Sequence, residues 1–221
     1  MRSNRKPITA DELADLQQAQ RDGERERLQR IERNRIEEQP IVSDLKELGV
    51  HVERVWELTK QRADWVRALP VLLRHLEADY STDTKSTLVR LLSVPHVKGV
   101  AAKPLIREYE KATDETSLKW TIGNALSVVA DDTVFDDIVR LAKDKRNGKA
   151  REMVVVALGN MRNPQAVDVL MELLDDSVVA GHAIMALRKL KATKAKEKVL
   201  PFQQHPVRWI REEAKKAIKK W

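Results

Sequence analysis

Apolar residues recur at helical spacing in five segments that share one nine-residue frame. The segments are TKSTLVRLL (84–92), LKWTIGNAL (118–126), AREMVVVAL (150–158), VAGHAIMAL (179–187) and IREEAKKAI (210–218). Successive segments end 34, 32, 29 and 31 residues apart. Positions one, five, eight and nine are mostly apolar, and at roughly 100° per residue these positions fall on one face of a helix. The pattern predicts five helices that each bury one stripe.

A second apolar-periodic segment precedes each of these five. These earlier segments begin at Arg67, Ala101, Thr133, Gln165 and Ala195, and three of them carry a proline near the start, at Pro70, Pro104 and Pro201. Proline is tolerated in a first helical turn, where its missing N–H has no intrahelical partner in any case. The short connectors contain the Gly, Pro and Asn typical of tight turns. The predicted unit is a helical hairpin repeated about every 31 residues.

In these features the chain resembles the HEAT-repeat family, in particular its short bacterial form related to the bilin-lyase-type repeats. The likeness rests on Ala157-Leu158-Gly159, on Met161 to Pro164 with Ala166 and Val167, and on the frame that runs from Ile210 to Ile218. It covers about residues 66–221 and implies an all-α, right-handed solenoid of about five hairpins. One hairpin cannot bury its own apolar face, so stacked neighbours supply the core.

The N-terminal part of the chain is expected to contain two further units. Residues 41–65 predict a helical cap broken at Gly49, in which Val52, Val55, Trp56 and Leu58 cover the open first repeat. Residues 1–40 are rich in charge and have a sparse apolar stripe, with a helix start expected at Thr9 or Asp11. This arm is interpreted as a long charged helix or as a partly disordered segment, and it is a candidate for self-association through residues 9–39.

Composition agrees with an all-α protein and narrows its chemistry. Glycine and phenylalanine are few, and helix-forming residues are abundant. The absence of cysteine excludes disulfides and thiolate sites and fits a reducing cytoplasm, and no stretch has the length and apolarity of a membrane span. The net charge of +7 is concentrated at the C-terminus, because residues 188–221 hold 12 Lys/Arg against three Asp/Glu.

Two sets of positions on the second helices are candidates for different roles. Position two is basic in four of the five repeats, at Lys85, Lys119, Arg151 and Arg211. The resemblance implies that such residues bond to the neighbouring turn as a structural ladder. It also implies that positions three, six and seven line a concave groove. A groove with apolar lining is either a partner site or a surface covered by the N-terminal helix. The predicted groove residues are Trp120, Asn124, Val155, Val156, Ile184 and Met185.

The last helix suggests a second surface. At helical spacing, its apolar residues share one face, which we expect to be buried: Val207, Ile210, Ala214, Ala217, Ile218 and Trp221. Trp209 falls on the opposite face, near Lys216 and Lys220. An outward tryptophan among lysines is able to stack on a base while the lysines contact phosphate. The alternative is a charged end cap in which Trp209 packs on the connector near Pro206. The basic surface comprises Arg188, Lys189, Lys191, Lys194, Arg208, Trp209, Lys215, Lys216, Lys219 and Lys220.

No motif in the chain indicates catalysis, a metal or a cofactor. The five histidines show no pairing with ligand spacing, and phosphate loops, nucleophile elbows and paired-carboxylate signatures are absent from the sequence. The leading hypothesis is a cytoplasmic, non-enzymatic adaptor or scaffold that receives a protein segment in its groove. The alternatives are nucleic-acid binding through the basic C-terminal repeat and, by likeness of fold alone, a HEAT-like enzyme or lyase-related accessory protein.

Overall fold

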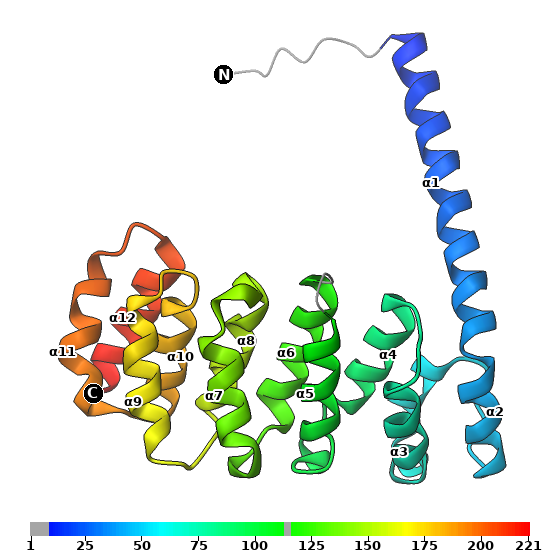
Figure 1. Cartoon of the computed structure of the whole chain (residues 1–221). Helices are drawn as coiled ribbons and strands as arrows, with labels where there is room; N and C mark the ends of the chain where they lie inside the picture. The colour runs from blue at the N-terminus through cyan, green and yellow to red at the C-terminus, as the bar shows by residue number, and fades with distance from the viewer. Residues whose placement is uncertain (1–8, 113–115) are drawn as a thin grey trace.

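The computed structural model describes residues 9–112 and 116–221, which form an all-α solenoid with no strand in these two ranges. Five hairpins follow one another, and Figure 1 shows their first helices side by side in one layer and their second helices in the other. The hairpins are α3 (Arg62–Leu76) with α4 (Thr82–Leu92), α5 (Ala102–Lys111) with α6 (Thr116–Val129), α7 (Phe135–Lys143) with α8 (Glu152–Leu158), α9 (Gln165–Glu172) with α10 (Ala180–Lys189), and α11 (Lys196–Val199) and its 3-10 continuation (Leu200–Gln204) with α12 (Arg208–Lys220).

The core runs without interruption between the two layers. Positions one, five, eight and nine of the frame are buried in every repeat except at Ile218, which is partly buried against the core. Each fully buried Leu or Ile contributes about 1.5–3 kcal/mol relative to an exposed one. The predicted stripe is therefore confirmed. Val207 is an exception to the predicted burial in the last helix, because it precedes α12 and is exposed.

Glycines allow the second helices to approach one another closely. A Cβ built on Gly159 would lie 2.8 Å from Cα of Ala186, and one built on Gly123 would lie 3.2 Å from the carbonyl oxygen of Ala150. Any side chain larger than hydrogen at Gly159 would collide with the backbone of α10. Consecutive second helices therefore pack on one another as well as on their own first helices.

The cap contains α2 (Gln39–Glu47) and a 3-10 helix (Val55–Lys60), with Gly49 in a left-handed turn between them. Its buried side chains are Ile41, Leu45, Val50, Val55 and Leu58. Trp56, expected to cover the first repeat, is instead 43% exposed with the Lys60 ammonium over its ring. In the short 3-10 helix, Val55 and Leu58 take the inward direction, and Trp56 lies between them on the other side.

Helix α1 (Ala10–Glu37) projects away from the end of the stack (Figure 1). A capping box starts it, in which Thr9 accepts from the Glu12 amide and Glu12 accepts from the Thr9 amide. Most of its side chains are exposed. The arm is thus helical from residue 10 onward and leaves the second helices of repeats two to five uncovered, and residues 1–8 lie outside the described part.

Two glutamates fix the base of α1 to the stack. Glu37 accepts from the Ser81 amide at 2.7 Å and from the Ser81 and Thr84 hydroxyls, at the start of α4. Glu38 is buried, pairs with Arg54 at 2.8 Å and accepts from the Val55 amide. These contacts determine the direction in which the arm leaves.

Some predicted boundaries shift by a few residues. The cap begins at Gln39, directly after α1, and the first hairpin begins at Arg62 instead of residue 66. Pro70 therefore lies inside α3, where its ring is exposed, while Pro104 and Pro201 lie in first turns as expected. Within the described ranges, no helix is long and apolar enough to cross a membrane.

Candidate partner-binding face

Three of the four basic residues predicted at position two form the bonds expected of a ladder, namely Lys85, Arg151 and Arg211. Lys85 donates to the Leu76 carbonyl in its own repeat and to Glu108 of the next repeat at 2.5 Å. Arg151 repeats this pattern, donating to the Ala142 carbonyl at 3.1 Å and to Asp176 at 2.7 Å. Arg211, in the last repeat, donates to the His205 and Pro206 carbonyls of its own connector. Each of these cations joins a second helix to a neighbouring turn.

The ladder pair at Arg151 lies in the interior of the stack. Arg151 is only 2% exposed. Burial alone would raise the pKa of Asp176, but the hydrogen bonds from Arg151 and from the Val178 amide outweigh it and hold this pKa below its usual range. Asp176 is therefore ionised at neutral pH and neutralises the buried guanidinium, as a buried cation requires.

The surface of the second helices is formed by positions three, four and seven, and we call these positions the second-helix face. Position four is partly buried in all five repeats, whereas position six is buried in the first four. At about 100° per residue, position six lies only about 40° from position two, on the side that packs against the neighbouring second helix. A second helix such as α8 packs against its own first helix and against the second helices on both sides. It therefore buries a wider part of its circumference than the one apolar stripe that the sequence predicts.

The predicted groove residues therefore divide into two groups. Val155 and Ile184, at position six, are fully buried and belong to the core, so their assignment to the groove was wrong. Trp120 is 48% exposed, and Asn124, Val156 and Met185 are partly exposed on the second-helix face. Met153 and His182 lie at position four of the same face. His182 was considered as a residue that faces the groove, whereas Met153 was not predicted there.

Trp209 continues this apolar surface onto the last repeat. A Cβ on Gly181 would lie 2.1 Å from the Trp209 ring, and the ring centroid is 5.1 Å from that of His182. The indole therefore rests on α10, while 43% of the residue stays exposed. Trp209 is thus exposed on one side, as the helical phase predicted, and packs against α10 on the other.

His182 is a titratable residue whose ring lies against this indole. Burial lowers the pKa of His182, and the carboxylate of Glu152, 4.0 Å away, opposes the shift without cancelling it. The Nδ1 atom of His182 is buried without a hydrogen-bond partner in the described structure. Neutral imidazole is thus the favoured form beneath Trp209.

Much of the basic surface is already engaged within the chain. Arg188 pairs with Glu213 at 3.1 Å, Lys194 with Asp168 at 2.6 Å, Lys215 with Glu212 at 3.0 Å and Lys216 with Glu213 at 2.7 Å. Lys189 donates to Asn160. The basic side chains of this surface that form neither an ion pair nor a hydrogen bond with any described residue are Lys191, Arg208, Lys219 and Lys220. Arg208 and Lys219 lie at opposite ends of α12, about 17 Å apart along its axis.

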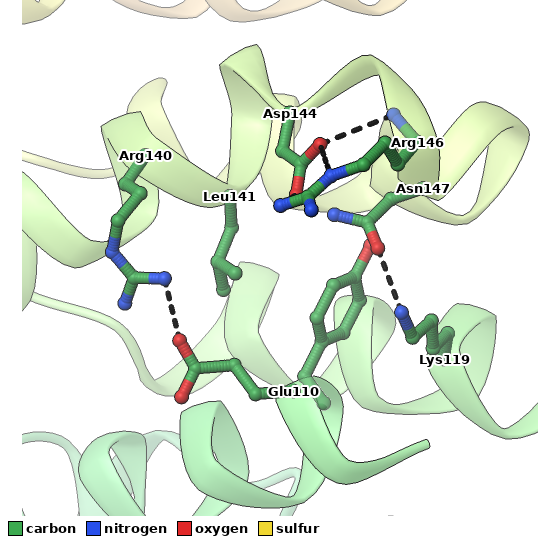
Figure 2. Close-up of a pocket in the computed structure, with 8 residues that line it drawn as sticks. Glu110, Lys119, Arg140, Leu141, Asp144, Arg146 and Asn147 are labelled. Carbon is green, nitrogen blue, oxygen red and sulfur yellow. Dashed lines mark hydrogen bonds and ion pairs between the residues drawn. The ribbon is translucent and has the colours of Figure 1, made fainter. Parts of the chain in front are cut away.

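A polar cavity of about 410 Å³ opens between the second and third repeats (Figure 2). Arg140 donates to Glu110 at 2.5 Å, Arg146 donates to Asp144 at 2.9 Å, and Lys119 donates to Asn147 at 2.7 Å. Tyr109 and Leu141 complete the lining. The residues of this cavity are distinct from those of the second-helix face.

No group of three or more His, Cys, Asp or Glu side chains suited to a metal occurs in the described ranges.

Comparison with protein families gives one match. A family model described as HEAT repeats matches residues 102–188, which span the second, third and fourth hairpins. Comparison with curated proteins gives no match, and neither does comparison with solved structures. The matched segment contains Trp120, Val156 and Met185 of the second-helix face.

Proposed function

Residues 102–188 belong to the HEAT-repeat family, and from this premise we propose that the chain is a non-enzymatic scaffold that binds a protein partner on its second-helix face. HEAT repeats are commonly protein-interaction scaffolds. Stacked repeats of this kind present extended surfaces that suit such binding. A cytoplasmic location is part of this proposal.

The observation that carries the proposal is a row of partly exposed apolar side chains on consecutive second helices. Trp120 lies on α6, Met153 and Val156 on α8, Met185 on α10 and Trp209 on α12. Helix α1 projects away from these residues and does not cover them (Figure 1). Exposed aromatic and methionine side chains are enriched at protein interfaces, and methionine adapts to partners of different shape.

The test pairs a double substitution on this face with a matched double substitution elsewhere. A partner that copurifies with the chain from its native cells is identified and then rebuilt from purified components. Trp120→Ala with Met185→Lys is expected to weaken binding at least about tenfold, because losing a buried interface aromatic typically costs more than about 1–2 kcal/mol. Trp56→Ala with Val66→Lys changes exposed residues of the cap and of α3 and is expected to bind normally.

Circular dichroism should show an unchanged helix content for both variants. Equal affinity of the face variant and the unaltered chain for the purified partner would remove the second-helix face from consideration. An equal loss in the two variants would also count against the face.

Nucleic-acid binding is the second candidate function. It is supported by four side chains of the basic surface that have neither an ion-pair nor a hydrogen-bond partner in the described structure, Lys191, Arg208, Lys219 and Lys220. If these residues contact phosphates, the affinity for single- or double-stranded DNA falls steeply between low and high salt, because bound counterions are released. Replacing Lys219 and Lys220 by Gln should then flatten the salt dependence. An affinity that does not respond to ionic strength would eliminate this function.

A further inference from the structure

The polar cavity between the second and third repeats interrupts the ladder. Lys119 occupies the same frame position as Arg151, and the residue 25 positions after each is an aspartate, Asp144 after Lys119 and Asp176 after Arg151. Both aspartates accept a hydrogen bond from the amide two residues further on. Arg151 pairs with its aspartate, whereas Asp144 is bound by the Arg146 guanidinium, with both nitrogen–oxygen distances at 2.9 Å. Lys119 forms no ion pair with Asp144, although its charge helps, after the Arg146 guanidinium and amide, to hold the pKa of Asp144 below its usual range.

Lys119 is therefore a nearly buried cation without an ion pair in the described ranges. Its residue is 9% exposed, and its ammonium donates to the neutral amide oxygen of Asn147 and lies 5.2 Å from the ring centroid of Tyr109. The other two cations of the cavity, Arg140 and Arg146, are each bound to a carboxylate. Arg140 is bound to a second carboxylate as well, that of Asp137. A buried charge is ordinarily paired, because desolvation without a partner is costly.

Tyr109 provides a second and independent indication of a ligand site. It is fully buried, lines the cavity, and its hydroxyl has no hydrogen-bond partner in the described structure. Burial raises the pKa of this hydroxyl, so it carries its proton at neutral pH and is a donor. Buried hydroxyls without a partner are rare in proteins and call for an explanation.

We propose that this cavity binds a small carboxylate, which accepts hydrogen bonds from Lys119 and Tyr109. Two donors converge on one cavity, and an acceptor with a single negative charge would balance the lone ammonium. Glu110 and Asp144 also line the cavity, and they disfavour a doubly charged phosphate by like-charge repulsion. The site is separate from the second-helix face and does not depend on the proposed scaffold function.

An NMR titration tests the proposal with sodium acetate as the probe. The side-chain amide of Asn147 is followed as acetate is added, with sodium chloride at equal ionic strength as the reference and inorganic phosphate as a second probe. We expect a saturable shift with acetate. Lys119→Met should weaken acetate binding about tenfold or more, because hydrogen bonds to charged groups are the stronger ones. Lys103→Met, which changes an exposed lysine on α5, should leave binding unchanged.

Tyr109→Phe is a second variant, and it tests the proposal even if Lys119→Met does not fold. It should weaken acetate binding while the unliganded variant melts at the same temperature as the unaltered chain or higher, since the unpartnered hydroxyl is gone. The proposal is overturned if acetate shifts the Asn147 signal no more than chloride does, or if phosphate binds and acetate does not. Unchanged acetate affinity in both Tyr109→Phe and Lys119→Met would overturn it as well.

Discussion

Arg151 is among the largest fully buried side chains of the chain, yet it is charged. Its guanidinium connects three segments, through the Gly148 and Ala142 carbonyls and the carboxylate of Asp176. The position in the frame predicted this role, because the spacing of a ladder residue is visible in the sequence. Its partner Asp176 was not predicted, since the 25 residues between them place it in the next turn only after the hairpins have packed.

Arg151→Met should lower the unfolding free energy by about 3–5 kcal/mol, because it removes the buried guanidinium and leaves the partly buried Asp176 carboxylate without its ion pair. Urea denaturation followed by circular dichroism measures the change. Lys143→Met serves as the control, because the Lys143–Glu172 pair is exposed and should contribute no more than about 1 kcal/mol. Equal effects of the two substitutions would show that Arg151 is not an interior ion pair.

His182 should make the stability depend on pH. Its folded pKa lies below the unfolded value of 6.5, so the unfolded chain binds more protons in this range. Unfolding free energy therefore rises with pH, and the contribution of His182 is complete above about pH 6.5 and is lost as pH falls through the folded pKa. Urea midpoints at about pH 7.5 and about pH 5.5 should differ less in His182→Gln than in the unaltered chain.

The control for the pH experiment is His51→Gln, which changes an exposed histidine. The Trp209 ring lies against His182, so tryptophan fluorescence should report the same pH transition. If His182→Gln shows the same pH dependence as the unaltered chain, burial of this imidazole is not the cause.

At the scale of the elements, two glycines with opposite surroundings test how tightly the second helices pack. Gly159→Ala should destabilise the fold by about 1–3 kcal/mol, because the new Cβ meets the backbone of α10 at Ala186. Gly23→Ala meets nothing within 4 Å on α1 and should favour that helix by up to about 1 kcal/mol. Thermal unfolding and helix content compare the two variants. Stabilisation by Gly159→Ala would contradict the close approach of α8 and α10.

The stability of the stack should depend on the last residues of α1, which contact it, and not on the rest of that helix. A chain that starts at Ile36 keeps Glu37 and Glu38, and we expect it to unfold at nearly the same urea concentration as the full chain. A chain that starts at Pro40 loses the Glu37 hydrogen bonds at the start of α4 and the buried partner of Arg54, and we expect the unfolding free energy to fall by about 2–5 kcal/mol. Equal stability of the two truncated chains would show that neither glutamate anchors the arm.

The same two truncated chains address self-association through residues 9–39, which stays a prediction. Most side chains of α1 are exposed, and they include Leu13, Leu16, Leu28 and Ile31. If the arm joins copies of the chain, the mass in solution should fall to that of a monomer when residues 1–35 are removed.

At the scale of the whole molecule, the stack could be predicted because its main signal is local and repeated. The apolar stripe of each second helix was visible in nine residues, and five copies determined the register. The face was harder to predict, because its limits depend on packing between repeats. Val155 and Ile184 were predicted to lie on the surface, but in the structure they are buried against the neighbouring second helix. The contact between Trp209 and Gly181 was not predicted for the same reason, since the two residues belong to different hairpins.

The most direct test of the binding face is site-specific photo-crosslinking in the presence of the purified partner. A photoreactive side chain at Val156, on the second-helix face, should form a covalent adduct with the partner, and one at Val66, exposed on α3, should not. Adducts from residue 156 alone are the predicted result. Adducts from residue 66, with none from residue 156, would contradict the proposal that the second-helix face binds the partner.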